Sequence, residues 1–278
     1  MTPIPDGVRR LADAAVRIAG VKAVTLGGSH ATGMADAGSD IDLHVYWRSP
    51  LAAAADRAAV LAPALDEAGP VRELTAWGLE DHAILDGVPV ELVYVELDPL
   101  RAEIDRAFEV GLDGEAFATA VLHSVTAGPL LADPDGELAS LRARLADYPP
   151  ATYRRQLDVL PGLLHAYLGQ LTKARSRGDL LFVQHRRYSV QLVWFALLFA
   201  LNRRYHPGEK RLLDHGERCA VRVAGQRERW EQIAEFGARD PRLPTALAGL
   251  VADLVALIPE GPAPSPSSRG ESPPTADS

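Results

Sequence analysis

The chain has 278 residues, of which 47% are hydrophobic and 24% are charged, so it has ample material for a hydrophobic core. The formal net charge of −8 argues against broad, nonspecific binding to nucleic acid or to an anionic membrane surface. The single cysteine, Cys219, excludes a disulfide within the chain and a zinc site built from cysteines, and it is in keeping with a cytoplasmic location.

The N-terminal segment predicts a helix, a strand and a turn. Apolar residues recur at helical spacing over residues 8–18, and Gly20 is expected to end that helix. The segment has no uninterrupted apolar stretch like that of a signal peptide. Residues 21–26, "VKAVTL", predict a buried strand. The two glycines that follow predict a tight turn, and "SHATGMA" is long enough only for a short helix or a loop.

The next segment predicts three more strands. The second strand is expected over residues 40–47, "DIDLHVYW", and an alanine-rich helix over residues 51–69, stopped by its last glycine. "VRELTAW", residues 71–77, predicts a third strand. Asp86-Gly87 between two apolar runs is the strongest hairpin signal in the sequence. In the second arm of this hairpin the alternating pattern places Glu91 on the face opposite to its apolar neighbours.

Beyond the hairpin the pattern becomes mainly helical. Residues 98–111 predict a helix, and residues 121–136 predict one more short strand that ends in a Pro-Asp-Gly turn. Helices are then expected to continue to about residue 258. The longest apolar run, residues 192–201, is about half the ~20 residues that a membrane span needs, so we interpret it as a core helix and expect no membrane association.

These elements predict an α+β N-terminal domain followed by an all-α domain. The first domain, residues 1–136, is expected to be a small mixed sheet with flanking helices, and the second, residues 137–259, a helical bundle. Residues 260–278 are rich in proline, serine and glycine and nearly free of large apolar side chains, which predicts a disordered tail.

Asp40 and Asp42 stand one residue apart on the second predicted strand. Side chains alternate between the faces of a strand, so the two carboxylates share one face, roughly 6.5 Å apart, while Ile41 and Leu43 face the core. Two like charges this close are unfavourable unless a cation lies between them, and aspartate oxygens suit hard cations such as Mg²⁺. A bare Asp-x-Asp pair more often marks a solvated strand end, so the neighbouring residues must decide.

The turn before this strand carries a second signal. Gly28-Ser29 follows directly on an apolar strand, and backbone N–H groups at such a turn can hold an anion, with the serine hydroxyl as a further donor. The turn is not a Walker loop, because no Gly-Lys-Ser/Thr follows. It is not a dinucleotide-binding fingerprint either, because "GGSHATG" lacks that glycine spacing. A phosphate site is therefore expected just ahead of the two aspartates.

Gly28-Ser29 followed by Asp40-Ile41-Asp42 resembles the signature of the DNA polymerase β-like nucleotidyltransferase superfamily. The chain is most similar to the minimal and aminoglycoside-type nucleotidyltransferases, over roughly residues 21–97. The resemblance implies a third acidic residue on a later strand of the same sheet, and "GVPVELVYVEL" supplies Glu91 there. The superfamily often has aspartate at this position, although the aminoglycoside-type enzymes can use glutamate.

The resemblance implies a site for two Mg²⁺ ions and a nucleoside triphosphate, with ATP as the expected nucleotide. Asp40 and Asp42 would bind metal, and Glu91 would act either as a further ligand or as the base that takes the proton of an acceptor hydroxyl. Ser29 and the Gly28 backbone would hold the triphosphate. Catalysis would then depend on positioning and on charge neutralisation.

Lys210 is a further candidate, because lysine is rare in this chain. Of the 29 basic residues only Lys22, Lys173 and Lys210 are lysines, and Lys210 follows a Pro-Gly turn. A compact ammonium suits contact with a triphosphate, and the resemblance implies a basic residue from the helical half. An ordinary surface lysine explains the position equally well.

The sequence thus predicts an enzyme, a Mg²⁺-dependent nucleotidyltransferase. It would move a nucleoside monophosphate, expected to be AMP from ATP, to a hydroxyl of a small molecule and release pyrophosphate. Transfer to a protein side chain or to an RNA end also agrees with the residues, although the acidic net charge disfavours RNA. The rival prediction is a noncatalytic nucleotide-binding or antitoxin-like module. The intact acidic residues and Gly28-Ser29 argue against it, because such modules commonly lose one of them.

Overall fold

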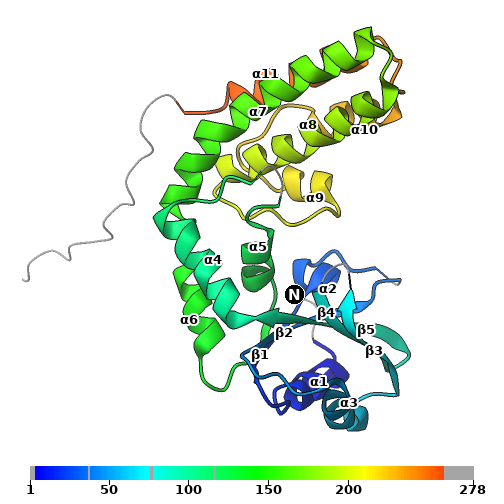
Figure 1. The fold of residues 1–278 in the computed structure, drawn as a ribbon, viewed down its shortest axis with the longest axis vertical. Helices are drawn as coiled ribbons and strands as arrows, with labels where there is room; N and C mark the ends of the chain where they lie inside the picture. Colours follow the sequence, from blue (N-terminus) through cyan, green and yellow to red (C-terminus); the bar gives the residue numbers. More distant parts are fainter. Residues whose placement is uncertain (1–3, 37, 76–77, 115–116, 260–278) are drawn as a thin grey trace, which may run out of the picture.

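A six-stranded mixed sheet forms the centre of the N-terminal half (Figure 1). The computed structural model describes residues 4–36, 38–75, 78–114 and 117–259, so the predicted tail lies outside the described residues. The strands run in the order β3-β4-β5-β2-β1-β6, and of the neighbouring pairs only β2 and β5 are parallel. Their bounds are β1 (Val21–Leu26), β2 (Ile41–Trp47), β3 (Glu67–Thr75), β4 (Gly78–Leu85), β5 (Val88–Glu96) and β6 (Leu130–Ala132).

Helices flank this sheet and then form the rest of the molecule. The N-terminal half contains α1 (Asp6–Ala15), α2 (Gly28–Thr32), α3 (Ala54–Leu61), a 3₁₀ turn (Ala62–Ala64), α4 (Leu97–Glu109) and α5 (Ala120–Ala127). The helices that follow are α6 (Glu137–Arg144), α7 (Pro150–Ser176), α8 (Leu180–Leu201), α9 (Leu212–Glu217), α10 (Gln226–Glu235) and α11 (Leu243–Val255). The predicted fold class, an α+β half followed by helices, is confirmed. The division at residue 137 stays a prediction.

Strand β2 has a different environment on each of its two faces. Ile41, Leu43 and Val45 are buried in one core cluster with the apolar face of α1 and part of α3. The alternate residues face the other way, and Tyr46 packs there with α4, α5 and α6. Asp42 therefore lies on the α5 side of the sheet, close to the end of the strand where the helical cover stops.

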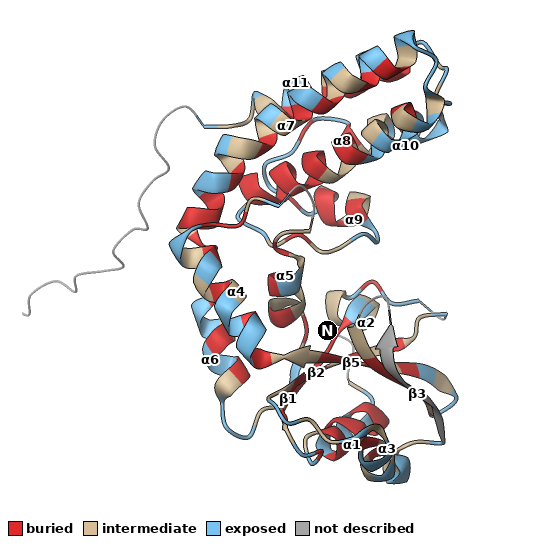
Figure 2. Ribbon diagram, viewed as in Figure 1, coloured by how far each residue is buried: buried red, intermediate tan, exposed pale blue. Residues whose placement is uncertain are grey.

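The helical half has a hydrophobic core of its own. Helices α7 and α8 pack along each other, and α10 and α11 complete a cluster around the fully buried Trp194. Figure 2 shows that most of the C-terminal part of α8 is buried, in agreement with its predicted role as a core helix. None of the helices among the described residues combines the length and the apolar character that crossing a bilayer requires.

The hairpin predicted at Asp86-Gly87 is confirmed. Leu85 of β4 pairs with Val88 of β5, and both turn residues have positive φ angles, 51° and 77°. This is the left-handed pair of conformations that a two-residue hairpin turn requires. The turn fixes which residues of β4 and β5 lie opposite each other.

Two predicted elements are wrong in part. The helix expected over residues 51–69 ends at Leu61, because Pro63 lacks the N–H that would continue it, and β3 begins at Glu67. Gly69 therefore lies inside a strand that pairs with β4 instead of ending a helix. The strand expected over residues 121–136 is confined to β6, because the residues before it form α5.

Candidate active site

A cleft of about 640 Å³ lies between the sheet and the helices above it. Its floor is formed by the ends of β1, β2, β5 and β4, with α2 at one side and α5 and α9 above (Figure 1). All six residues that the sequence marked as site residues line this cleft: Gly28, Ser29, Asp40, Asp42, Glu91 and Lys210. The structure thus brings together residues from both halves of the chain.

Three carboxylates meet at the floor of the cleft. Asp40 was predicted to begin the strand but immediately precedes β2 in the structure, and Asp42 is the second residue of the strand. Glu91 lies directly beside Asp42 because the parallel register of β2 and β5 pairs the two residues. One carboxylate oxygen from each of the three lies within 4.8 Å of the others. This is the convergence expected from the strand pattern, and the oxygen-only donor set suits Mg²⁺.

The electrostatics of Asp42 show why a cation fits here. The pKa of Asp42 is raised to about 6, mainly by burial and then by the neighbouring charges of Asp40 and Glu91. Lys210 and His30 act in the opposite direction and lower the pKa. A divalent cation bound by the three carboxylates would remove this repulsion, so the residues present fit the metal that the sequence implied.

Two glycines allow the backbone before α2 to approach Asp42 closely. Gly28 has a φ of +55°, and a Cβ at this position would overlap Oδ2 of Asp42. The backbone N–H of Gly27 donates to the carbonyl oxygen of Asp42 over 2.8 Å, and a Cβ on Gly27 would lie 2.8 Å from Cε1 of His44. Ser29 follows in the first turn of α2 and lines the same cleft. Side chains at either glycine would therefore separate this turn from the carboxylates.

Lys210 reaches the cleft from the loop between α8 and α9. Its charge lowers the pKa of Asp42, which places the ammonium group within electrostatic reach of that carboxylate. The loop is held at its base, because the Gly208 N–H donates to Nδ1 of His206 over 3.2 Å and the His206 N–H donates to Oγ1 of Thr119 over 2.9 Å. Lys210 therefore lines the cleft from a loop that is anchored to the residue before α5.

Glu80 in the floor of the cleft and His82 beside it were not found as site residues from the sequence. Glu80 of β4 is buried and lines the cleft, and Nε2 of His82 lies 3.4 Å from Oε2 of Glu80. Nδ1 of His82 lies 3.8 Å from Oε1 of Glu91, its partner across the antiparallel pair. Counting back from the Asp86-Gly87 turn would have found both, since that turn fixes the pairing of β4 with β5.

Four residues line the side of the cleft opposite the sheet: Phe117, His123, Ser124 and His215, here called the helical wall. The rings of His123 and His215 meet edge to face, with centroids 5.9 Å apart. Burial lowers the pKa of His215 to about 4, with a smaller contribution from His123, and burial also lowers the pKa of His123. Both imidazoles are therefore neutral near pH 7.

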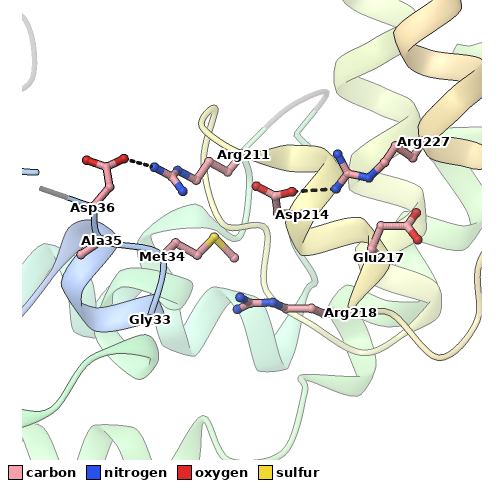
Figure 3. A pocket seen from close by; sticks show the side chains of 9 residues that line it. All are labelled: Gly33, Met34, Ala35, Asp36, Arg211, Asp214, Glu217, Arg218 and Arg227. Carbon is pink, nitrogen blue, oxygen red and sulfur yellow. Dashed lines mark hydrogen bonds and ion pairs between the residues drawn. The ribbon is translucent and has the colours of Figure 1, made fainter. Parts of the chain in front are cut away.

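A second hollow, drawn in Figure 3, shares Met34 and Arg211 with the lining of the cleft. Nη2 of Arg211 lies 2.8 Å from Oδ2 of Asp36, in the segment between α2 and β2. Nη1 of Arg218 donates to the carbonyl oxygen of Thr32 over 3.2 Å. These contacts hold the start and the end of α9 against the segment that leads into Asp40.

Two family models match separate parts of the chain. Residues 8–110 match the model of a nucleotidyltransferase domain, and residues 115–212 match a domain of unknown function, DUF4037. Among solved structures, the chain is similar to a nucleotidyltransferase-like protein from Exiguobacterium sibiricum 255-15. The identity is 14% and the TM-score 0.44, over 90% of this chain and 75% of that chain. No curated protein matches the sequence.

Proposed function

We propose, from the match of residues 8–110 to the nucleotidyltransferase domain model, that this protein transfers a nucleoside monophosphate from a nucleoside triphosphate to a hydroxyl group. The family match confirms the resemblance to the DNA polymerase β-like superfamily that the sequence motifs indicated. It supports nucleotide transfer in general. ATP as the nucleotide, Mg²⁺ as the metal and a small molecule as the acceptor are the finer parts of the proposal.

The reaction is an in-line displacement at the α-phosphorus. The acceptor oxygen forms a bond to the α-phosphorus, the bond from that phosphorus to the bridging oxygen of the β-phosphate breaks, and pyrophosphate leaves with the electron pair. The acceptor proton passes to Glu91, whose side chain is 36% exposed and can pass the proton on to water. Proximity and charge neutralisation supply most of the rate acceleration in such a site.

Asp40, Asp42 and Glu91 would hold the divalent metal, which neutralises phosphate charge and polarises the α-phosphate when it is bound. Ser29 and the backbone of Gly28 hold the triphosphate from the α2 side, where their N–H groups and the hydroxyl are donors. Lys210 contributes a positive charge from the α8–α9 loop, which lines the same cleft. The observation that carries the proposal is the meeting of all these groups in one cleft.

A small molecule is the acceptor that best fits the rest of the cleft. Outside the three carboxylates, the cleft is also lined by the acidic Glu80 and Glu209, and the whole chain has a net charge of −8. This charge repels a polyanionic acceptor such as an RNA end. A hydroxyl on a neutral or cationic small molecule meets no such repulsion.

Incubation with α-labelled ATP, Mg²⁺ and a panel of hydroxyl-bearing acceptors tests the proposal directly. We expect label to appear on one class of acceptor together with one pyrophosphate for each transfer. Asp40→Asn should abolish both signals, while Asp158→Asn, a change of an exposed carboxylate on α7, should leave them unchanged. Binding of MgATP without transfer to any small molecule, protein or RNA acceptor would favour the noncatalytic alternative.

A further inference from the structure

The helical wall has no part in the transfer as described above, although its four residues line the cleft. Phe117, His123 and Ser124 lie within residues 115–212, the segment that matches a domain of unknown function, and His215 follows three residues beyond it. Its side chains combine an aromatic ring, a hydroxyl and two imidazoles. None of them belongs to the carboxylate site or to the Gly28-Ser29 turn.

The sheet order sets the direction of the proposed displacement. The phosphate-binding turn follows β1, Asp42 lies on β2, and Glu91 and Glu80 lie on the next two strands, β5 and β4. Pyrophosphate leaves on the Ser29 side and the acceptor hydroxyl approaches on the Glu91 side. The line between the attacking and leaving oxygens therefore runs across the strands, parallel to the surface of the sheet.

The nucleoside has to leave this line at a large angle. In an in-line displacement the attacking and leaving oxygens are apical, and the oxygen that carries the nucleoside is equatorial, roughly perpendicular to them. The sheet blocks the perpendicular directions on its own side, so a nucleoside that stays inside the cleft lies on the side away from the sheet. That side is formed in part by α5 and α9, which carry His123 and His215.

The chemistry of the wall suits a planar, uncharged ligand. Each neutral imidazole presents one N–H donor and one nitrogen acceptor, which matches the edge of a nucleobase. The ring of Phe117 and the methyl group of Ala120 add apolar surface beside them. A phosphate group would instead need cations, and the imidazoles of the wall are uncharged near pH 7.

We propose that His123 and His215 form the nucleobase subsite of this protein and hold the base of the triphosphate against the α5–α9 side of the cleft. This assignment rests on the proposed nucleotidyl transfer and adds the residues that recognise the base. It also gives a role to the segment of unknown function, which would bind the nucleoside while the sheet binds the phosphates. His123 is only partly buried and lies directly at the cleft surface.

The test compares two ligands that share the phosphates and differ in the nucleoside. Calorimetry in the presence of Mg²⁺ and without acceptor measures the binding of inorganic tripolyphosphate and of ATP, GTP, CTP and UTP. We expect wild type to bind at least one nucleotide more tightly than tripolyphosphate. His123→Ala and His215→Ala should each lower the affinity for that nucleotide about tenfold, which corresponds to the loss of one hydrogen bond. Neither substitution should change the affinity for tripolyphosphate.

Tripolyphosphate binding also shows that each variant still has a folded phosphate site. If an alanine variant does not melt cooperatively, His123→Asn replaces it in the test. The matched control is His165→Ala, at an exposed histidine of α7, which should leave the affinity for both ligands unchanged. The subsite is overturned if the variants lose affinity equally for tripolyphosphate and for the nucleotide, or lose affinity for neither. The subsite is also overturned if wild type binds tripolyphosphate as tightly as every nucleotide, although the phosphate site then remains supported. If wild type binds neither tripolyphosphate nor any nucleotide, the proposed function itself is overturned.

Discussion

Gly28 lies where the backbone of α2 comes closest to the carboxylate of Asp42. Gly28→Ala should lower the free energy of unfolding by about 1–3 kcal/mol, because the residue has a positive φ and the new Cβ meets Oδ2 of Asp42. It should also abolish metal-dependent nucleotide binding. Chemical denaturation and calorimetry measure the two effects.

Gly33 offers a matched control for that substitution. Its φ of +68° is similar, but a Cβ there would have nothing within 4 Å. Gly33→Ala should therefore show the cost of backbone strain alone and retain nucleotide binding. Equal effects of the two substitutions would mean that contact between Gly28 and Asp42 has no part in the site.

The ionised carboxylate of Asp42 lowers the free energy of unfolding of the metal-free protein, because its pKa is raised. An ordinary aspartate ionises near pH 3.8, whereas the folded protein holds the pKa of Asp42 at about 6. The unfolded chain therefore loses this proton at lower pH than the folded protein does. The resulting loss in the free energy of unfolding grows as the pH rises from 3.8 to 6 and stays constant above pH 6. Asp42→Asn removes it.

The melting temperature of Asp42→Asn in EDTA should therefore exceed that of wild type near neutral pH. We expect a gain of about 1–2 kcal/mol, less than the full linkage because the carboxylate is only partly buried. The gain should shrink as the pH falls from 6 toward 4, while Asp158→Asn shows no gain at any pH. A lower melting temperature of Asp42→Asn at neutral pH would show that the carboxylate is a structural hydrogen-bond acceptor.

At the scale of elements, the α8–α9 loop brings its one lysine into a cleft whose other charges are mainly acidic. Lys210→Ala should weaken MgATP binding by at most roughly 1.5–3 kcal/mol, the range for a charged hydrogen bond, and leave the fold intact. Lys210→Arg should restore part of the affinity, because a guanidinium keeps the charge but fits a compact site less well. Calorimetry with MgATP measures both.

Lys173 provides the control for the loop. It is an exposed lysine in the last turn of α7, and Lys173→Ala should leave the affinity for MgATP unchanged. If Lys210→Ala also binds MgATP like wild type, the loop has no part in phosphate binding and position 210 is ordinary surface.

The elements that the sequence predicted well are those with strong local signals. The alternation in β2 and the Asp86-Gly87 turn placed Asp42 and Glu91 on one face, and the structure brings them together. The end of α3 and the start of β3 depend on pairing with β4, which local propensity does not contain. Recognition of the helical wall would have required the position of α5 over the sheet, which depends on the tertiary fold.

At the scale of the whole molecule, three histidines with lowered pKa values make the fold sensitive to acid. Burial lowers the pKa of His44, His206 and His215 to about 4, against about 6.5 in an unfolded chain. Between these values the unfolded chain binds protons that the folded protein does not, so the free energy of unfolding falls as the pH drops from 6.5 to 4. Each histidine adds a slope of at most about 1.4 kcal/mol per pH unit.

Urea unfolding at several pH values in this range measures the slope, and His206→Gln removes one of the three contributions. The variant should be less stable near neutral pH, because the His206 ring packs edge to face against Phe117 and Phe199. Its stability should nevertheless decline less steeply with acid than that of wild type. An unchanged slope would show that His206 titrates alike in the folded and unfolded states.

The parallel pairing of β2 with β5 also has a consequence for the order of folding. The β4–β5 hairpin joins residues close in sequence and can form early, whereas β2 must wait until the chain has passed through α3 and β3. We therefore expect Asp42 and Glu91 to meet late in folding and their repulsion to add to the barrier of that step. We expect Mg²⁺ to accelerate refolding in stopped-flow experiments, because the cation neutralises the two strands as they join.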